Sequence, residues 1–207
     1  MTPERLARIK QILDSRQPDL TVLTDQVHKP RNLSAIIRSC DAFGLADMHA
    51  VWPKEGYRAF RKTAGGSFNW VTTHTHPTMA DAVTTLRDRG HKLYAAQLSD
   101  RAVDYREVDY TVPCAVIMGN EVDGVSADAA ELADEHIVIP MMGMVESLNV
   151  SAACAIILSE AQRQRKAVLQ RLAQKCEFTV LTETALDRVG EETELALDRQ
   201  NRIQRQI

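Results

Sequence analysis

Three apolar runs of the sequence are each followed by a short polar or glycine-rich turn. The first run ends at Leu98, the second covers residues 114–118 and leads into Gly119, and the third ends at Ile139. In parallel α/β sheets, ligands bind outside the carboxyl ends of the strands. The three turns therefore predict the walls of one ligand pocket.

The turn after the second run lies between Gly119 and Gly124. Glycine at both ends leaves the backbone bare and lets a ligand approach the main chain closely, although a purely structural turn explains the pattern equally well. The lysine and the serine or threonine of a phosphate-binding loop do not follow, and no GxGxxG occurs. Nucleoside triphosphate hydrolysis and dinucleotide binding therefore lack their motifs.

Two polar residues, Ser147 and Asn149, stand just before an apolar stretch at 150–158 that predicts a helix. Either residue can cap that helix. Alternatively, the helix start presents its free backbone N–H groups and these polar side chains to a ligand. A group of methionines nearby predicts either an adaptable apolar surface or plain core: Met141, Met142 and Met144.

A second predicted helix, at 32–43, begins with Asn32, a residue type that favours the N-cap position. At about 100° per residue, Arg38 lies on the face opposite the apolar side chains of this helix. Those apolar residues are Leu33, Ile36 and Cys40. Arg38 is therefore predicted on a polar face, where it is either solvated or free to contact a substrate.

Positive charge is concentrated in two segments, although the 207-residue chain has a formal net charge of −3. The clusters comprise Lys54, Arg58, Arg61 and Lys62, and then Arg163, Arg165 and Lys166. Clusters of this kind bind the phosphates of nucleic acids. The net charge argues against a uniformly basic nucleic-acid-binding protein, so any such binding would use a local cationic face.

Several other chemistries lack their residues. The cysteines form no CxxC pair, which predicts buried thiols rather than disulfides or a zinc site; they are Cys40, Cys114, Cys154 and Cys176. The pair His74 and His76 has no cysteine or carboxylate beside it at a metal-ligand spacing, so these histidines are expected to alternate along a strand. No metal ion is expected. The absence of GxSxG removes support for a serine hydrolase.

The composition is that of an ordinary folded domain, with 44% hydrophobic and 26% charged residues, which excludes disordered and fibrous classes. No apolar stretch approaches the ~20 residues that cross a bilayer. The first ten residues lack an apolar segment and include Glu4, Arg5, Arg8 and Lys10. A secretory signal is therefore not expected, and we expect the protein to be cytoplasmic.

Strand-like and helix-like segments alternate along the chain, which predicts an α/β fold with a mostly parallel sheet flanked by helices. The predicted strands are 20–27, 48–52, 71–76, 93–98, 114–118 and 137–139. The further predicted helices are 79–88, 127–133 and a long one from about Leu148. A leading helix is predicted to begin with Thr2 as its cap and Pro3 in its first turn. We therefore expect a helical extension at 1–18, an α/β domain at 19–165 and a helical appendage at 166–207.

Three segments together resemble the motifs of the SPOUT-class RNA ribose 2'-O-methyltransferases. They lie at residues 32–38, 117–124 and 139–151. The segments 50–53, 98–100 and 160–165 are similar to the branch of this family that modifies tRNA. The resemblance covers most of the chain and is lost after Cys176.

The resemblance implies that the α/β domain is a methyltransferase domain whose C-terminal part forms a deep trefoil knot, with S-adenosylmethionine bound in the knotted loops. The implied cofactor contacts, mostly through the backbone, are at Ala96, Leu98, Gly119, Ile139, Met144 and Leu148. It further implies a homodimer with active sites at the subunit interface. The expected reaction methylates a ribose 2'-hydroxyl of tRNA, with guanosine 18 of the D-loop as the expected target.

The catalytic residues of the family correspond to Arg38, Asn32, Glu121, Ser147 and Asn149. The family proposal makes Arg38 a general base, but arginine stays protonated in proteins, so we expect it to orient the hydroxyl and an RNA phosphate. The other four residues would position Arg38 or the ribose and organise the loops around the cofactor.

The resemblance places the RNA contacts mainly on basic residues. Those expected are Arg8, Lys10, Arg31, Arg58, Arg61, Lys62, Arg163 and Arg165. Two alternatives stay open. One is a ribosomal RNA 2'-O-methyltransferase, and the other is a catalytically silent RNA-binding module on the same scaffold.

Overall fold

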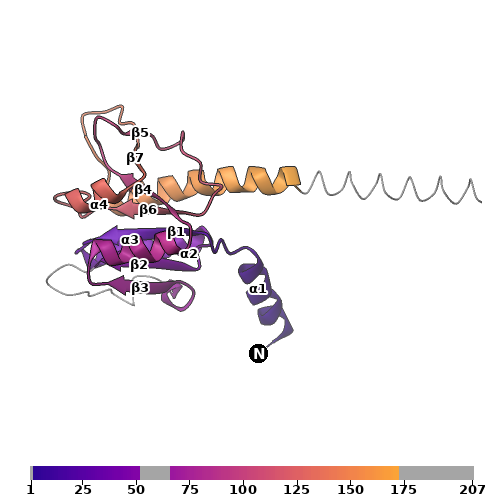
Figure 1. Ribbon diagram of the computed structural model, residues 1–207. Coiled ribbons are helices and arrows are strands. Elements are labelled where there is room, and N and C mark those ends of the chain that lie inside the picture. Colours follow the sequence, from indigo (N-terminus) through magenta and orange to yellow (C-terminus); the bar gives the residue numbers. More distant parts are fainter. Residues whose placement is uncertain (1, 52–65, 173–207) are drawn as a thin grey trace, which may run out of the picture. The chain divides into compact units, whose positions relative to one another are not determined.

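The computed structural model describes residues 2–51 and 66–172, which contain a seven-stranded sheet in which all pairings are parallel (Figure 1). The strand order is β3-β2-β1-β6-β4-β7-β5. The strands are β1 (Leu20–Asp25), β2 (Asp47–Val51), β3 (Thr72–His76), β4 (Lys92–Ala96), β5 (Val103–Asp104), β6 (Cys114–Met118) and β7 (Glu135–Val138). The predicted parallel α/β fold is confirmed, and the sequence pattern missed only the two-residue β5 among these strands.

Four α-helices connect or flank the strands: α1 (Pro3–Asp14), α2 (Pro30–Ala42), α3 (Met79–Asp88) and α4 (Ala127–Leu132). A short 3-10 helix, η1, covers Ser67–Asn69, and a last helix covers residues 150–172. Hydroxyl side chains cap three of the α-helices by accepting a backbone N–H bond, as predicted for Thr2. The cap oxygens belong to Thr2, Thr78 and Ser126.

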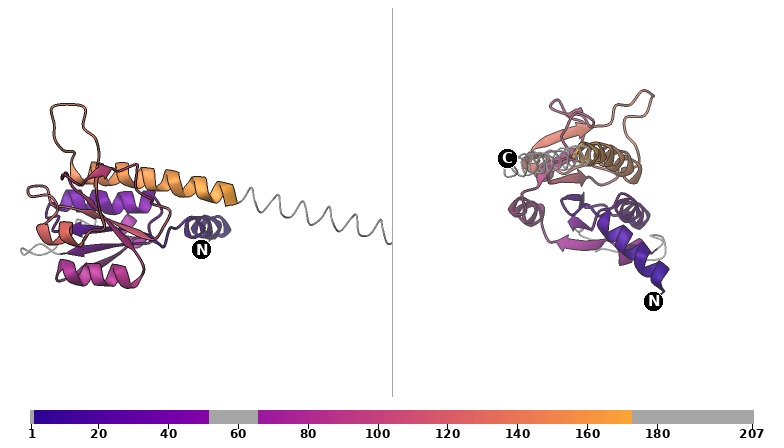
Figure 2. Two further views of the ribbon diagram at one scale, coloured as in Figure 1. Left: turned by 45° about the horizontal axis from the view of Figure 1, so that its top comes forward. Right: turned by 90° about the vertical axis from the view of Figure 1, so that its right-hand side faces the viewer.

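Alternating residues of the sheet face two separate apolar cores. On β6, Val116 packs with residues of α2 and of the segment 150–161, whereas Ile117 packs with residues of α3 and α4. Figure 2 shows α3 on one side of the strands and α2, with the start of the last helix, on the other. Burying an aliphatic side chain fully contributes roughly 1.5–3 kcal/mol. Both faces of the sheet therefore hold the strands in place.

The strands that lead into the three predicted turns are neighbours in the sheet, since β4 pairs with β6 on one side and with β7 on the other. Because all three are parallel, their carboxyl ends meet at one edge. β7 also pairs with β5, so it lies between two strands that precede it in the chain. In this half of the sheet, the spatial order of the strands therefore differs from their order in the sequence.

The chain divides into two units after Gln164. All of the strands and helices α1 to α4 belong to the first unit, and the described part of the second, 165–172, is helical. The helical appendage expected at residues 166–207 remains a prediction. In the described ranges, no helix combines the length and the apolar character that crossing a membrane requires.

Candidate active site

A cavity of about 570 Å³ lies at the carboxyl ends of β4, β6 and β7. Five of the six predicted cofactor residues line it: Ala96, Leu98, Gly119, Ile139 and Leu148. Met144 is fully exposed and does not belong to this lining. Cavities of roughly 300–1,000 Å³ accept small-molecule ligands, so the predicted pocket exists and has a suitable size.

Gly119 shapes the floor of this cavity because its backbone touches another part of the same turn. A Cβ on Gly119 would overlap the carbonyl group of Gly124 and the backbone nitrogen of Val125. Asn120 and Gly124 exchange two backbone hydrogen bonds of 2.9 and 3.2 Å, and Gly124 has a positive φ of 74°. The bare glycines are therefore required by the turn itself, whatever ligand also uses the exposed backbone.

Three predicted catalytic side chains form a hydrogen-bonded network at the cavity. The Asn32 side-chain amide on α2 donates to Glu121 Oε1 over 2.6 Å, and the Asn149 amide donates to Asn32 Oδ1 over 3.1 Å. Glu121 and Asn149 also line the cavity. A hydrogen bond to a charged group contributes about 1.5–3 kcal/mol, so Asn32 and Glu121 hold each other in position.

The second oxygen of Glu121 is buried and has no hydrogen bond among the described residues. His28 Nδ1 lies 3.2 Å from this oxygen, while the Glu121 side chain is only 7% exposed. An unpaired buried oxygen carries a desolvation cost. Glu121 Oε2 is therefore available to a donor, supplied either by protonated His28 or by a ligand.

The expectation that Asn32 caps its helix is wrong. α2 begins at Pro30, and Lys29 occupies the cap position without a side-chain hydrogen bond. Proline presets the first helical residue, so the helix starts earlier than the sequence pattern suggested. Asn32 is thereby freed to reach Glu121 and Asn149.

Asn149 caps the helix that begins at residue 150, which confirms the capping reading of the sequence. Its Oδ1 accepts hydrogen bonds from the Ser151 backbone nitrogen at 2.9 Å and from the Ser151 hydroxyl at 2.6 Å, which caps the helix at residue 150. Its amide nitrogen donates to Asn32 at the same time. Ser147 is exposed, lies in the loop before this helix and lines the cavity.

Arg38 is exposed on α2, opposite the buried face that the periodicity predicted. Its guanidinium has no hydrogen-bonding or ion-pairing partner within residues 2–51 and 66–172, and it does not line the cavity. The structure thus brings Glu121, Ser147 and Asn149 together at the cavity and joins Asn32 to them. It leaves Arg38 exposed on α2 and outside the cavity lining.

Residues 19–159 match the model of the SpoU rRNA Methylase family. The chain belongs to this family. It is 54% identical over 166 residues to the tRNA (guanosine(18)-2'-O)-methyltransferase of Escherichia coli K12, covering 80% of this chain and 72% of the relative. It is 55% identical over 164 residues to the protein of the same name from Thermus thermophilus, covering 79% and 84%.

Solved structures of SpoU-family proteins are also similar to this fold. The crystal structure of the A. aeolicus TrmH/SpoU tRNA modifying enzyme matches with a TM-score of 0.74 and 41% identity over 79% of this chain and 84% of that one. AviRb from Streptomyces viridochromogenes, in complex with the cofactor AdoMet, matches with a TM-score of 0.64 and 29% identity over 74% and 61%.

The cavity suits a cofactor with polar edges in ways that the motifs did not reveal. Gln97 follows β4 directly and lines the cavity, and its side-chain Oε1 is buried without a partner among the described residues. The Gln97 backbone nitrogen donates to the Ile137 carbonyl over 3.0 Å, which fixes the residue to β7. Its position at a strand end was the signal that could have identified it.

The predicted RNA contacts fall into four groups. Arg8, Lys10 and Arg31 are exposed. Arg163 donates two hydrogen bonds of 2.7 Å to Glu160, and these bonds lower the pKa of the Glu160 carboxyl. The positive charge of Arg163 is therefore already paired with Glu160. Arg165 is partly buried. The remaining three, Arg58, Arg61 and Lys62, lie outside the described residues, as does Lys54.

The thiols take no part in this site. Cys40, Cys114 and Cys154 are buried, as predicted, and Cys176 lies outside the described residues. Burial raises the pKa of the Cys154 thiol to about 12. Because the thiolate is the reactive form, this cysteine is chemically inert near neutral pH.

Proposed function

We propose that this chain transfers a methyl group from S-adenosylmethionine to the ribose 2'-hydroxyl of guanosine 18 in tRNA. The observation that carries the proposal is the network of Asn32, Glu121 and Asn149 beside the strand-end cavity. Two curated relatives with more than half of the aligned residues identical are named for this reaction. The cytoplasmic location expected from the sequence is part of the same proposal.

The cofactor would lie in the cavity between the ends of β4, β6 and β7, where it supplies an electrophilic methyl group. The backbone at Ala96, Leu98, Gly119, Ile139 and Leu148 would hold it, with Met144 added from the exposed loop. Gln97 Oε1 would accept a hydrogen bond from the polar edge of the ligand. Such a contact would remove the cost of leaving that oxygen buried and unpaired.

Arg38 is the proposed catalytic residue. Methyl transfer is an in-line displacement, so the protein must hold the 2'-hydroxyl in line and let a proton leave as the new bond forms. An arginine remains charged in water and in proteins, which suits it to grip an RNA phosphate and orient the hydroxyl. We propose that the phosphate or a water accepts the proton, with Arg38 holding the geometry.

We propose that the active unit is a homodimer. Arg38 is exposed and unpaired among the described residues, and it does not line the cavity of its own chain. A second copy packed against α2 would enclose Arg38 and complete the site. Sedimentation of the purified chain, which separates a monomer from a dimer, tests this directly.

We propose the trefoil knot from the family resemblance, and the sheet order leaves room for it. β7 lies between β4 and β5, so the chain inserts a late strand between two earlier ones. The loops on either side of this insertion carry the proposed cofactor contacts. The RNA contacts proposed from the resemblance lie elsewhere, on exposed basic residues such as Arg8, Lys10 and Arg31.

Transfer of a radiolabelled methyl group from S-adenosylmethionine tests the function. The acceptors are unmodified bulk tRNA and, separately, ribosomal RNA, followed by nuclease mapping of the labelled nucleoside. Label in 2'-O-methylguanosine at position 18 of tRNA is the expected result. Label in ribosomal RNA alone would show that ribosomal RNA, and not tRNA, is the substrate. No label in either RNA, with the cofactor still bound, would favour a silent RNA-binding scaffold.

A further inference from the structure

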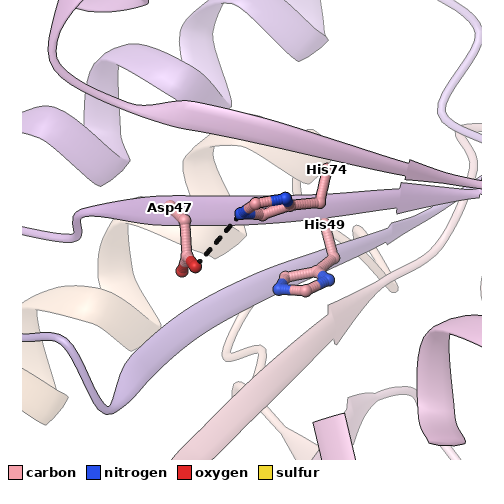
Figure 3. A group of neighbouring side chains, drawn as sticks. All are labelled: Asp47, His49 and His74. Atoms are coloured by element: carbon pink, nitrogen blue, oxygen red, sulfur yellow. Dashed lines mark ion pairs between the residues drawn. The ribbon is translucent and has the colours of Figure 1, made fainter. Parts of the chain in front are cut away.

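A group of ionisable side chains on β2 and β3 lies on one face of the sheet, outside the cavity lining (Figure 3). His49 is directly opposite His74 in the parallel register, and Asp47 is two residues before His49, so all three point the same way. Asp47 Oδ2 is 3.4 Å from His74 Nε2. One ligand atom from each residue lies within 4.8 Å of the other two.

His49 is the buried member of this group and is incompletely satisfied. The residue is 0% exposed, and its Nδ1 lies 2.9 Å from His76 Nε2. Its other nitrogen, Nε2, is buried and has no hydrogen-bond partner among the described residues. A buried polar atom without a partner costs about 1–3 kcal/mol, so a ligand on this nitrogen would remove that desolvation cost.

Two tautomers satisfy the contact of His49 with His76, and one of them suits metal binding. If His49 Nδ1–H donates to His76 Nε2, then His49 Nε2 carries a free lone pair. Histidine ligands in metal sites characteristically donate their second N–H to a neighbouring acceptor in this way.

We infer that Asp47, His49 and His74 form a binding site for a divalent transition metal of the zinc class, with water completing the coordination. Ligand atoms at about 2.1 Å from a tetrahedral zinc lie about 3.4 Å apart. The Asp47–His74 pair already has this separation. The donors are two imidazole nitrogens and a carboxylate oxygen, which favour Zn²⁺, Co²⁺ or Ni²⁺ over Mg²⁺.

Arg89 places a positive charge beside the proposed metal ligand Asp47. Its guanidinium Nη1 lies 3.3 Å from Asp47 Oδ2, and its side chain is 48% exposed. A cation at this site must compete with Arg89 for the Asp47 carboxylate. Because Arg89 is half exposed, it can move into solvent when a metal binds, and its removal should strengthen metal binding.

The metal would join the edge strand β3 to its neighbour β2. Among the described residues, β3 pairs with β2 alone, through five parallel positions. An edge strand has one unpaired side, so a link through His74 would fix it to the sheet. This site shares no residue with the cavity lining and is independent of the proposed methyl transfer.

Titration of the full chain, first stripped of metal with a chelator, tests the inference. Calorimetry with Zn²⁺ and Co²⁺ should show one site, and the Co²⁺ complex should absorb in the visible range without a sulfur charge-transfer band. His74→Gln and Asp47→Asn should each weaken binding by about 100-fold or more, since loss of a residue that only supports a ligand already costs about 10–100-fold. Arg89→Gln should tighten it.

The controls separate metal binding from folding. His28→Gln removes a histidine outside the group and should leave the metal affinity unchanged. Melting of each metal-free variant, followed by circular dichroism, checks that the fold is intact; His74 and Asp47 are partly exposed, so these substitutions are tolerable. The inference is wrong if the wild-type chain binds neither ion, if both ligand variants retain binding, or if the cobalt spectrum shows thiolate ligands.

Discussion

The strand-end cavity and the histidine group on β2 and β3 hold their polar side chains in different ways. At the cavity, Asn32, Glu121 and Asn149 come from segments far apart in the chain and meet across three separate elements. In the histidine group, His49 and His74 are direct partners in adjacent strands. The first arrangement depends on how whole elements pack, and the second on the register of one strand pair.

This difference predicts separable consequences. Changes at the cavity should alter methyl transfer or cofactor binding, because the network positions groups around the reacting atoms. Changes in the histidine group should alter metal affinity or the pH dependence of stability and leave methyl transfer unaffected. A variant in one region that disturbed the other would show that the two are coupled.

The largest expected effect is on activity, from Arg38→Ala. Removing the group that orients the hydroxyl should reduce methyl transfer by about 10³-fold, within the usual range for a residue that assists proton transfer. The affinity for S-adenosylmethionine, measured by calorimetry, should be retained because Arg38 does not line the cavity. Arg38→Lys keeps the charge and loses the planar fork, so full recovery would assign the role to charge alone and partial recovery would show that the fork contributes. Unchanged activity in Arg38→Ala would contradict the proposed role.

Gly119→Ala should damage the cavity through the backbone. The added Cβ overlaps Gly124 and Val125, so the turn must open, at a cost of about 1–3 kcal/mol in the free energy of unfolding. The affinity for S-adenosylmethionine should fall with it. Gly143→Ala is the matched control, because a Cβ there meets no atom within 4 Å. Equal melting temperatures for the two variants would show that the close approach at Gly119 is unimportant.

Asn149 tests whether capping and the network can be separated. Asn149→Ala loses the cap to Ser151 and the bond to Asn32, whereas Asn149→Ser keeps a capping oxygen but is too short to reach Asn32. Loss of the cap should reduce the free energy of unfolding by about 1 kcal/mol in the alanine variant alone. Both variants should bind S-adenosylmethionine more weakly, as calorimetry can measure. Normal affinity in the serine variant would leave Asn149 with capping as its role.

The cavity could be predicted from the sequence because its signals are local. Apolar runs predicted β4, β6 and β7, and parallel strands necessarily bring their ends to one edge. Gly119 and Asn149 also showed their roles through residue type and spacing. The network itself could not be predicted, since Asn32 looked like a cap until Pro30 was seen to begin the helix.

The histidine group was missed for a physical reason. His74 and His76 have no ligand at a suitable spacing along their own strand, so the local pattern predicted no metal. The partners Asp47 and His49 lie on β2, and only the register of β2 with β3 brings them together. Parallel pairing between strands separated by a long connection leaves no short-range pattern in the sequence. The exposed position of Met144 likewise depends on the path of a loop.

The smallest expected effect distinguishes the histidine group by its response to pH. In metal-free protein, burial is the main cause that lowers the pKa of His49 to about 4 from the ordinary 6.5, with smaller contributions from His74, His76 and Arg89, while Asp47 opposes the shift. Between these values the unfolded chain binds a proton at His49 and the folded chain does not. The free energy of unfolding should therefore fall as the pH drops from about 6.5 to about 4, with a slope approaching about 1.4 kcal/mol per pH unit from this group. Urea unfolding across this range should show a shallower slope for His49→Gln, and identical slopes would place the pH dependence elsewhere.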